Sequence, residues 1–162
     1  MDLILAFNSI RDIPYKIPLS SDEVDACCSG KHEKLFKLLI DRGYKVRYRV
    51  CAFVWSSLNL PSELEKIPHD DYCTHIYLEI NLGGKWEILD ATWDKGLKRI
   101  FHVNEWDGKS DTEIAVKPIK IFSPQKSLKI VKDQNKEANE KDLEINGKFY
   151  KGFNEWLEKN RS

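Results

Sequence analysis

The chain has 162 residues, of which 41% are hydrophobic and 32% are charged, a composition that is ordinary for a single folded domain spanning residues 1–162. The 26 Lys and Arg residues equal the 26 Asp and Glu residues in number, so the formal net charge is zero. This balance gives no reason to expect broad electrostatic binding to nucleic acid or to an anionic membrane surface.

The N-terminal residues lack the pattern of a signal peptide. Asp2 is acidic where such a peptide is basic, and the apolar run over 3–7 is short, with no small-residue cleavage site after it. No stretch of the chain approaches the roughly 20 apolar residues that a membrane-spanning helix needs. We therefore expect a cytoplasmic protein that is not embedded in a membrane.

Residues 9–18 contain two prolines, and the opening of the chain through this segment is predicted to be an extended lead-in rather than a helix. Polar residues that favour helix starts follow, so a helix is expected to begin between residues 22 and 30. An apolar stripe over 31–42 extends this helix, and Gly43 is a natural end for it. Cys28 then lies at, or just before, the first helical turn.

Alternating side chains over 44–55 predict a β-strand. Two further strands, over 74–82 and 85–92, are separated by Gly83-Gly84, a pair that is typical of a two-residue hairpin turn. The order of these elements predicts an α+β fold in which one helix packs on an antiparallel sheet.

Outside this core the sequence signals are weaker, and residues 56–73 are expected to be irregular, with a short helix over 61–66 as an option. Short strands are predicted over 114–121 and 128–131. The charge-rich run 132–141 is expected to be a solvated loop or an exposed helix. The last segment, 153–159, has the pattern of a short amphipathic helix that packs through its apolar side chains.

The four cysteines, Cys27, Cys28, Cys51 and Cys73, show no C-x-x-C spacing, so neither a zinc ribbon nor a redox motif is predicted. No metal or organic cofactor is implied. Cys51 and Cys73 are most simply small buried residues. Cys28 differs because the unpaired N–H groups and the dipole at a helix N-terminus favour a thiolate. The same N–H groups are suited to stabilise an oxyanion during attack on an amide or ester.

The predicted hairpin brings a histidine next to a carboxylate. With the two glycines as the turn, Tyr77 lies opposite Asp90, and His75, two residues from Tyr77, becomes a diagonal neighbour of Asp90 on the same face. A slip of one residue would put the two on opposite faces. The register therefore predicts an imidazole within about 2.6–3.2 Å of an orienting carboxylate, as nucleophilic catalysis by a thiol requires.

Two blocks of the sequence resemble the transglutaminase-like superfamily. Residues 28–47 open with a cysteine at a helix start and end in Gly-Tyr-Lys-Val-Arg, which is similar to the G-I-P-A-R segment after the nucleophile helix of that family. Residues 74–93 resemble its H-A-W-x-E-V … W-x-x-x-D-P-T pattern, with Tyr77 at the aromatic position and Ala91 in place of the proline. The resemblance covers about residues 25–94, and residues 95–162 are then peripheral strands and a C-terminal helix.

The resemblance implies a papain-like core in which a nucleophile-bearing helix packs on an antiparallel sheet. It implies a triad with Cys28 as nucleophile, His75 as base and Asp90 as the acid that orients the base. The function implied is acyl-group chemistry on an amide or peptide through a Cys28 thioester, with water or an amine as acceptor. The expected partner is therefore a peptide or protein substrate.

Several alternatives stay open at this point. Cys27 is expected to be a packing residue, because the spacing from Cys28 to the end of the helix fits the family pattern better. His32, one helical turn after Cys28, is a rival base or a structural histidine. The candidates for contacting the substrate are His32, Tyr77 and Trp93. The alternative function is a non-catalytic domain of the same fold that binds a peptide or protein in its cleft.

Overall fold

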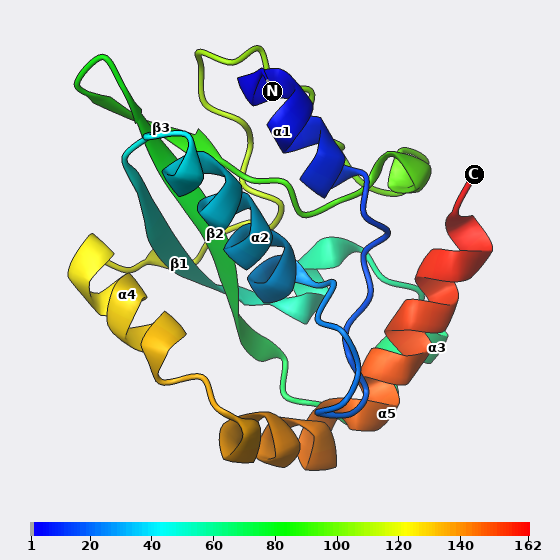
Figure 1. Cartoon of the computed structure of the whole chain (residues 1–162). Helices are drawn as coiled ribbons and strands as arrows, with labels where there is room; N and C mark the ends of the chain where they lie inside the picture. Colours follow the sequence, from blue (N-terminus) through cyan, green and yellow to red (C-terminus); the bar gives the residue numbers. More distant parts are fainter. Residues whose placement is uncertain (1) are drawn as a thin grey trace.

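A computed structural model describes residues 2–162 and shows a curled four-stranded sheet with helices around it (Figure 1). Neighbouring strands are antiparallel, and their order across the sheet is β3-β2-β1-β4. The strands are β1 (Val46–Val54), β2 (Tyr72–Leu82), β3 (Lys85–Leu89) and β4 (Lys120–Ile121). The helices are α1 (Leu3–Arg11), α2 (Cys28–Asp41), α3 (Ser62–Glu65), α4 (Pro124–Lys132) and α5 (Lys136–Asn160), with 3-10 turns η1 (Trp55–Leu58) and η2 (Lys95–Leu97). The predicted α+β class with an antiparallel sheet is confirmed.

The β2–β3 hairpin has the predicted register. Leu82 pairs with Lys85, and the pairing continues residue by residue to Leu89. Gly83 and Gly84 have positive φ angles of 62° and 91°, the backbone that a two-residue hairpin turn requires and that glycine adopts without steric cost. The two glycines therefore fix which side chains of β2 and β3 share a face.

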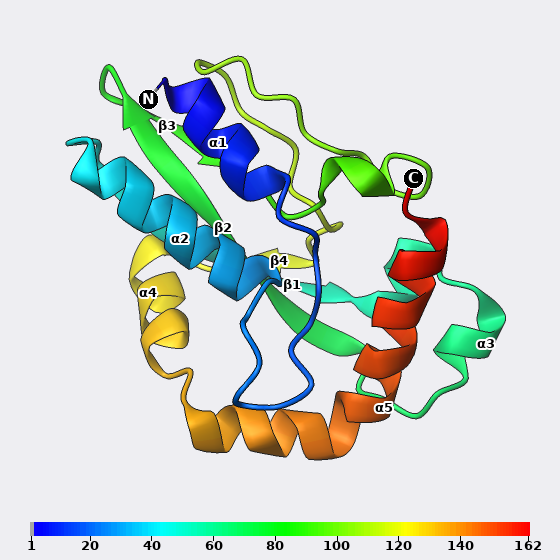
Figure 2. The same ribbon diagram turned by 45° about the vertical axis from the view of Figure 1, so that its right-hand side comes forward.

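Helix α2 lies across one face of the sheet (Figure 2). Leu35 and Leu39 of α2 are fully buried against Leu78 and Ile80 of β2, and Phe7 of α1 packs into the same cluster. Burial of one such side chain contributes about 1.5–3 kcal/mol, so this cluster holds the helix that carries Cys28 firmly on the sheet.

Helix α5 closes a second core. Phe149 and Phe153 of α5 are fully buried, and both rings pack edge-on against Trp55. The helix has 25 residues, so it includes the helix predicted over 153–159 and most of the charge-rich run over 132–141. Figures 1 and 2 show α5 changing direction partway along, and its first half passes across the end of the molecule where α2 begins.

The prediction that the opening segment through residue 18 is not helical is wrong for residues 3–11 and holds for residues 12–18. Residues Leu3–Arg11 form α1, and the Asp2 side chain caps it by accepting a hydrogen bond from the Ile4 N–H at 3.3 Å. Both prolines of the segment, Pro14 and Pro18, lie beyond the end of the helix and do not interrupt it.

The two strands predicted in the C-terminal third are largely wrong as well. Residues 128–131 lie within α4, where Ser123 is the N-cap and Pro124 occupies the first turn, an arrangement that starts a helix rather than a strand. Only Lys120–Ile121 of the strand predicted over 114–121 pairs with the sheet, at the free edge of β1.

Candidate functional site

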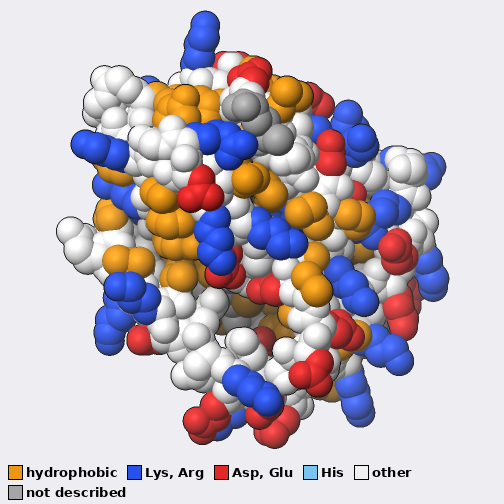
Figure 3. Space-filling view, viewed as in Figure 1, with side chains coloured by type: hydrophobic (Ala, Val, Ile, Leu, Met, Phe, Trp, Pro, Cys, Tyr) orange, Lys and Arg blue, Asp and Glu red, His pale blue; other side chains and the backbone are white. Residues whose placement is uncertain are grey.

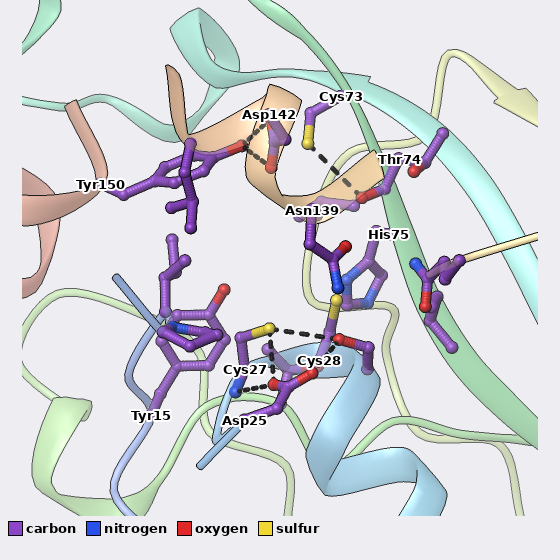
Figure 4. A pocket seen from close by; sticks show the side chains of 18 of the residues that line it. Tyr15, Asp25, Cys27, Cys28, Cys73, Thr74, His75, Asn139, Asp142 and Tyr150 are labelled. Carbon is purple, nitrogen blue, oxygen red and sulfur yellow. Dashed lines mark hydrogen bonds between the residues drawn. The ribbon is translucent and has the colours of Figure 1, made fainter. Parts of the chain in front are cut away.

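A cavity of about 300 Å³ opens beside the N-terminal end of α2. Its wall includes Cys28 at the start of α2, His75 on β2, the loop over 15–25 and residues from the first half of α5 (Figure 4). Figure 3 shows the opening as a hollow in the lower part of the viewed face. Two of the three predicted triad residues therefore border one cavity.

Cys28 occupies the first position of α2. The Lys31 N–H donates to the Cys27 carbonyl at 3.0 Å, so the earlier N–H groups of this turn, including that of Cys28, have no acceptor one turn back. The N-terminus of a helix, with such N–H groups and the positive end of the dipole, is a position that attracts anions. Gly30 is required here, because a Cβ at this position would collide with the carbonyl oxygen of Asp25.

His75 and Asp90 form the hydrogen bond that the hairpin register predicts. His75 Nε2 and Asp90 Oδ2 are 2.7 Å apart, and the two side chains are only 3% and 0% exposed. Within residues 2–162, the second ring nitrogen of His75, Nδ1, has no hydrogen-bond partner. In Figure 4 the Cys28 sulfur points toward the His75 ring. The three predicted triad residues thus lie together, with Asp90 behind the imidazole.

The Asp90 carboxylate accepts three further hydrogen bonds. Oδ1 accepts from the Thr92 N–H at 3.0 Å and from the Thr92 hydroxyl at 2.5 Å, and Oδ2 accepts from the Ala115 N–H at 2.8 Å. Burial raises the pKa of Asp90, but the neighbouring imidazoles and the hydrogen bonds from His75 and Thr92 outweigh it and hold the pKa below its ordinary value. Asp90 is therefore ionised at neutral pH.

His32 is fully buried beneath the site and bonded at both ring nitrogens. Nδ1 is 2.8 Å from the Cys28 carbonyl oxygen and donates to it, while Nε2 accepts from the Ala91 N–H at 2.9 Å. This pairing fixes the neutral tautomer with its proton on Nδ1. Burial lowers the pKa of His32 to about 4, despite the nearby Asp90. His32 therefore joins α2 to the loop after β3 and does not border the cavity.

The other two substrate-contact candidates differ in position. Tyr77 is buried with its ring beside that of His75, at 6.1 Å between centroids, and it does not border the cavity. Trp93 does border the cavity, and its Nε1–H donates to the Ala115 carbonyl at 3.1 Å. Of the three predicted candidates, only Trp93 is placed to touch a molecule bound in the cavity.

No sequence motif identifies Asp25 as a residue of the site, but its carboxylate is hydrogen-bonded to the thiol of Cys27. The Cys27 Sγ–H donates to Asp25 Oδ1 at 2.9 Å, and the Ser29 hydroxyl donates to Oδ2 at 2.6 Å. A hydrogen bond with Cys28, together with burial and the charge of Asp25, raises the pKa of Cys27 well above its ordinary value. Cys27 is therefore held as a neutral thiol.

Burial also favours the neutral thiol in the two remaining cysteines. Burial raises the pKa of Cys51 and that of Cys73 to about 12. Cys51 lies in the core, as expected, whereas Cys73 borders the cavity. Of the four thiols, Cys28 alone combines a helix N-terminus with a neighbouring imidazole.

Helix α5 supplies the far wall of the cavity, and no sequence motif locates this wall. Asn139, Asp142 and Tyr150 line it, and the Tyr150 hydroxyl donates to the Asp142 carboxylate at 2.9 Å (Figure 4). These residues follow Cys28 by more than one hundred positions. No motif near the cysteine or the histidine signals that they meet.

Comparisons of this chain with protein-family models, with curated proteins and with solved structures return no match. Over residues 2–162, no helix is long and apolar enough to cross a membrane, and no group of three or more His, Cys, Asp and Glu side chains is placed to hold a metal ion. The fold and the site together define a mixed α+β protein whose cavity holds a cysteine, a histidine and, behind the histidine, a buried aspartate.

The neutral state of His32 predicts a loss of stability in acid. The pKa of His32 in the folded protein, about 4, lies below the ordinary 6.5. The contribution of His32 to the free energy of unfolding is therefore full above pH 6.5 and is lost as the pH falls toward 4. Between pH 7 and pH 5, the free energy of unfolding of the parent should fall by roughly 2 kcal/mol more than that of His32→Gln, as measured by urea denaturation. The exposed His102→Gln serves as the control and should keep the parent's pH dependence. An identical pH dependence in His32→Gln would contradict this role.

The contrast between the two adjacent thiols predicts selective alkylation. Iodoacetamide at pH 7 should label Cys28 before the other three cysteines, as read by peptide mass spectrometry. Asp25→Asn removes the carboxylate that accepts the Cys27 proton, so labelling of Cys27 should become several-fold faster. Asp22→Asn, on the exposed part of the same loop, is the control. Labelling of Cys27 before Cys28 in the parent protein would end the assignment of the nucleophile.

Proposed function

We propose that this chain is a member of the transglutaminase-like superfamily with a papain-like core, and that it performs acyl-group chemistry through Cys28. The observation that carries this proposal is the buried 2.7 Å hydrogen bond between His75 and Asp90 beside a cysteine that begins a helix. A nucleophile, a base and an acid that orients the base are the parts that a thiol triad needs.

The first half of the reaction forms a thioester. Asp90 holds the proton on Nε2, so the Nδ1 lone pair of His75 is free to take the proton of the Cys28 thiol. The sulfur attacks the carbonyl carbon of an amide, and the carbonyl oxygen becomes an oxyanion. When this intermediate collapses, the C–N bond breaks and His75 returns its proton to the departing amine.

The second half of the reaction releases the acyl group. Water or an amine attacks the thioester carbon while His75 takes a proton from it, and Cys28 departs as a thiolate. Attack by water gives a carboxylic acid, which is hydrolysis, and attack by an amine gives a new amide, which is transamidation. The same triad serves both outcomes, so access of the acceptor to the cavity decides between them.

The charge of the cavity wall bears on the substrate. The acidic residues Glu23, Asp25 and Asp142 line it, whereas no Lys or Arg within residues 2–162 does so. Trp55 and Trp93 add aromatic faces, which attract cations. These features favour a basic peptide or a primary amine over an anionic substrate.

Acylation by p-nitrophenyl acetate tests the proposed function. Mixing the ester with the protein should release p-nitrophenolate in an initial burst and leave an acetyl group on Cys28, located by peptide mass spectrometry. Cys28→Ala should abolish the burst. His75→Ala and Asp90→Asn should slow it by about 100-fold, less than the roughly 10⁴-fold loss in a serine triad because a thiol depends less on its base. Cys27→Ala, which removes the neighbouring thiol, is the matched control and should keep the burst.

The alternative is the non-catalytic domain that binds a peptide or protein in the same cavity. It gains support if the parent forms no acetyl-Cys28, or if Cys28→Ala releases p-nitrophenolate as fast as the parent. The fold of every variant is checked by circular dichroism, so a slow burst can be assigned to the chemistry.

A further inference from the structure

The oxyanion that forms during acylation needs hydrogen-bond donors, and the first turn of α2 supplies backbone N–H groups. The Cys28 N–H lies next to the reacting sulfur and has no acceptor within the helix. Enzymes of this chemistry place preorganised N–H groups at the position where the negative charge develops. The cavity wall also offers a side-chain donor on another element.

Asn139 on α5 is in the right position. Its backbone N–H donates to the Asn135 carbonyl at 3.0 Å as part of the helix. Asn139 is an exposed residue on the cavity wall, and its side-chain amide, which has no hydrogen-bond partner within residues 2–162, is open to a bound molecule. Figure 4 shows this amide extending from α5 toward the Cys28 sulfur and the His75 ring. A carboxamide N–H is one of the donors known to stabilise oxyanions.

The surroundings of Asn139 hold its helix turn in place. Asp142, one turn later, is already bonded to the Asn146 amide at 2.7 Å and to the Tyr150 hydroxyl, so it does not draw the Asn139 amide away. Asn146 also accepts from the Asp70 N–H at 2.8 Å, which ties α5 to the segment before β2. The donor is therefore presented by a fixed helix rather than by a loop.

We propose that Asn139 is a catalytic residue whose side-chain N–H, together with the Cys28 backbone N–H, binds the oxyanion of the acylation step. This inference rests on the proposed function of Cys28. With p-nitrophenyl acetate, a bond forms between the Cys28 sulfur and the carbonyl carbon, and the C=O electron pair moves onto the oxygen held by the two N–H groups. The C=O bond then re-forms, the bond to p-nitrophenolate breaks, and the thiol proton remains on His75 until it passes to solvent.

Two reactions of the same thiol separate this role from any effect on the sulfur itself. Acylation by p-nitrophenyl acetate passes through an oxyanion, whereas alkylation by iodoacetamide is a displacement at a saturated carbon and forms none. Asn139→Leu should slow acylation of Cys28 by about 100-fold, the loss seen when one oxyanion donor is removed, and leave the alkylation rate unchanged. Asn139→Asp keeps the size but replaces the N–H donor with a carboxylate that repels the oxyanion, so it should slow acylation by more than Asn139→Leu does.

Glu140→Leu, a change at the next position of α5 on a side chain that does not line the cavity, is the matched control and should keep both rates. Circular dichroism should show parent-like helix content in all variants. If Cys28 of Asn139→Leu is acylated at the parent rate, the role proposed for Asn139 is overturned. The burst of the parent would still support the proposed function. The role of Asn139 is also overturned if acylation and alkylation slow equally, because Asn139 then acts on the thiol. A parent protein that forms no acetyl-Cys28 overturns both the role of Asn139 and the proposed function of Cys28.

Discussion

The buried carboxylate of Asp90 is the constraint on which the site depends. A charge with no exposed surface is costly unless each oxygen is paired, and here His75, Thr92 and Ala115 donate to it. These donors come from β2, from the loop after β3 and from the segment that crosses to β4. Satisfying one carboxylate therefore fixes the imidazole and the two segments that enclose it.

Helix α2, which begins at Cys28, is tied to the same point by two of its buried side chains. His32 links the Cys28 carbonyl to the Ala91 N–H, and Lys31 donates to three carbonyls, including that of Thr92 at 2.7 Å. Burial lowers the pKa of Lys31 to about 8, which leaves it mostly protonated at neutral pH. Hydrogen bonds beneath the cavity therefore hold Cys28 and His75 in place relative to each other.

The sequence predicts the parts of the site that depend on local rules. Two adjacent glycines fix the hairpin register, and the register alone brings His75 to Asp90. The sequence does not predict contacts between distant segments, such as the place of Asn139 on the cavity wall. A polar residue on an exposed helix and a polar residue that faces a cleft have the same sequence pattern. The prolines at 14 and 18 predict an extended segment, but they restrict only the backbone near them and do not exclude α1, whose apolar residues pack on α2.

The claim that Cys28, His75 and Asp90 act as one unit is tested most directly by a double-mutant cycle. The rate of Cys28 alkylation by iodoacetamide at pH 7 is measured in the parent, Asp90→Asn, His75→Ala and the double variant. Because Asp90 acts only through the imidazole, the double variant should be no slower than His75→Ala alone. Losses that multiply in the double variant would show that Asp90 and His75 act independently, and would contradict a triad.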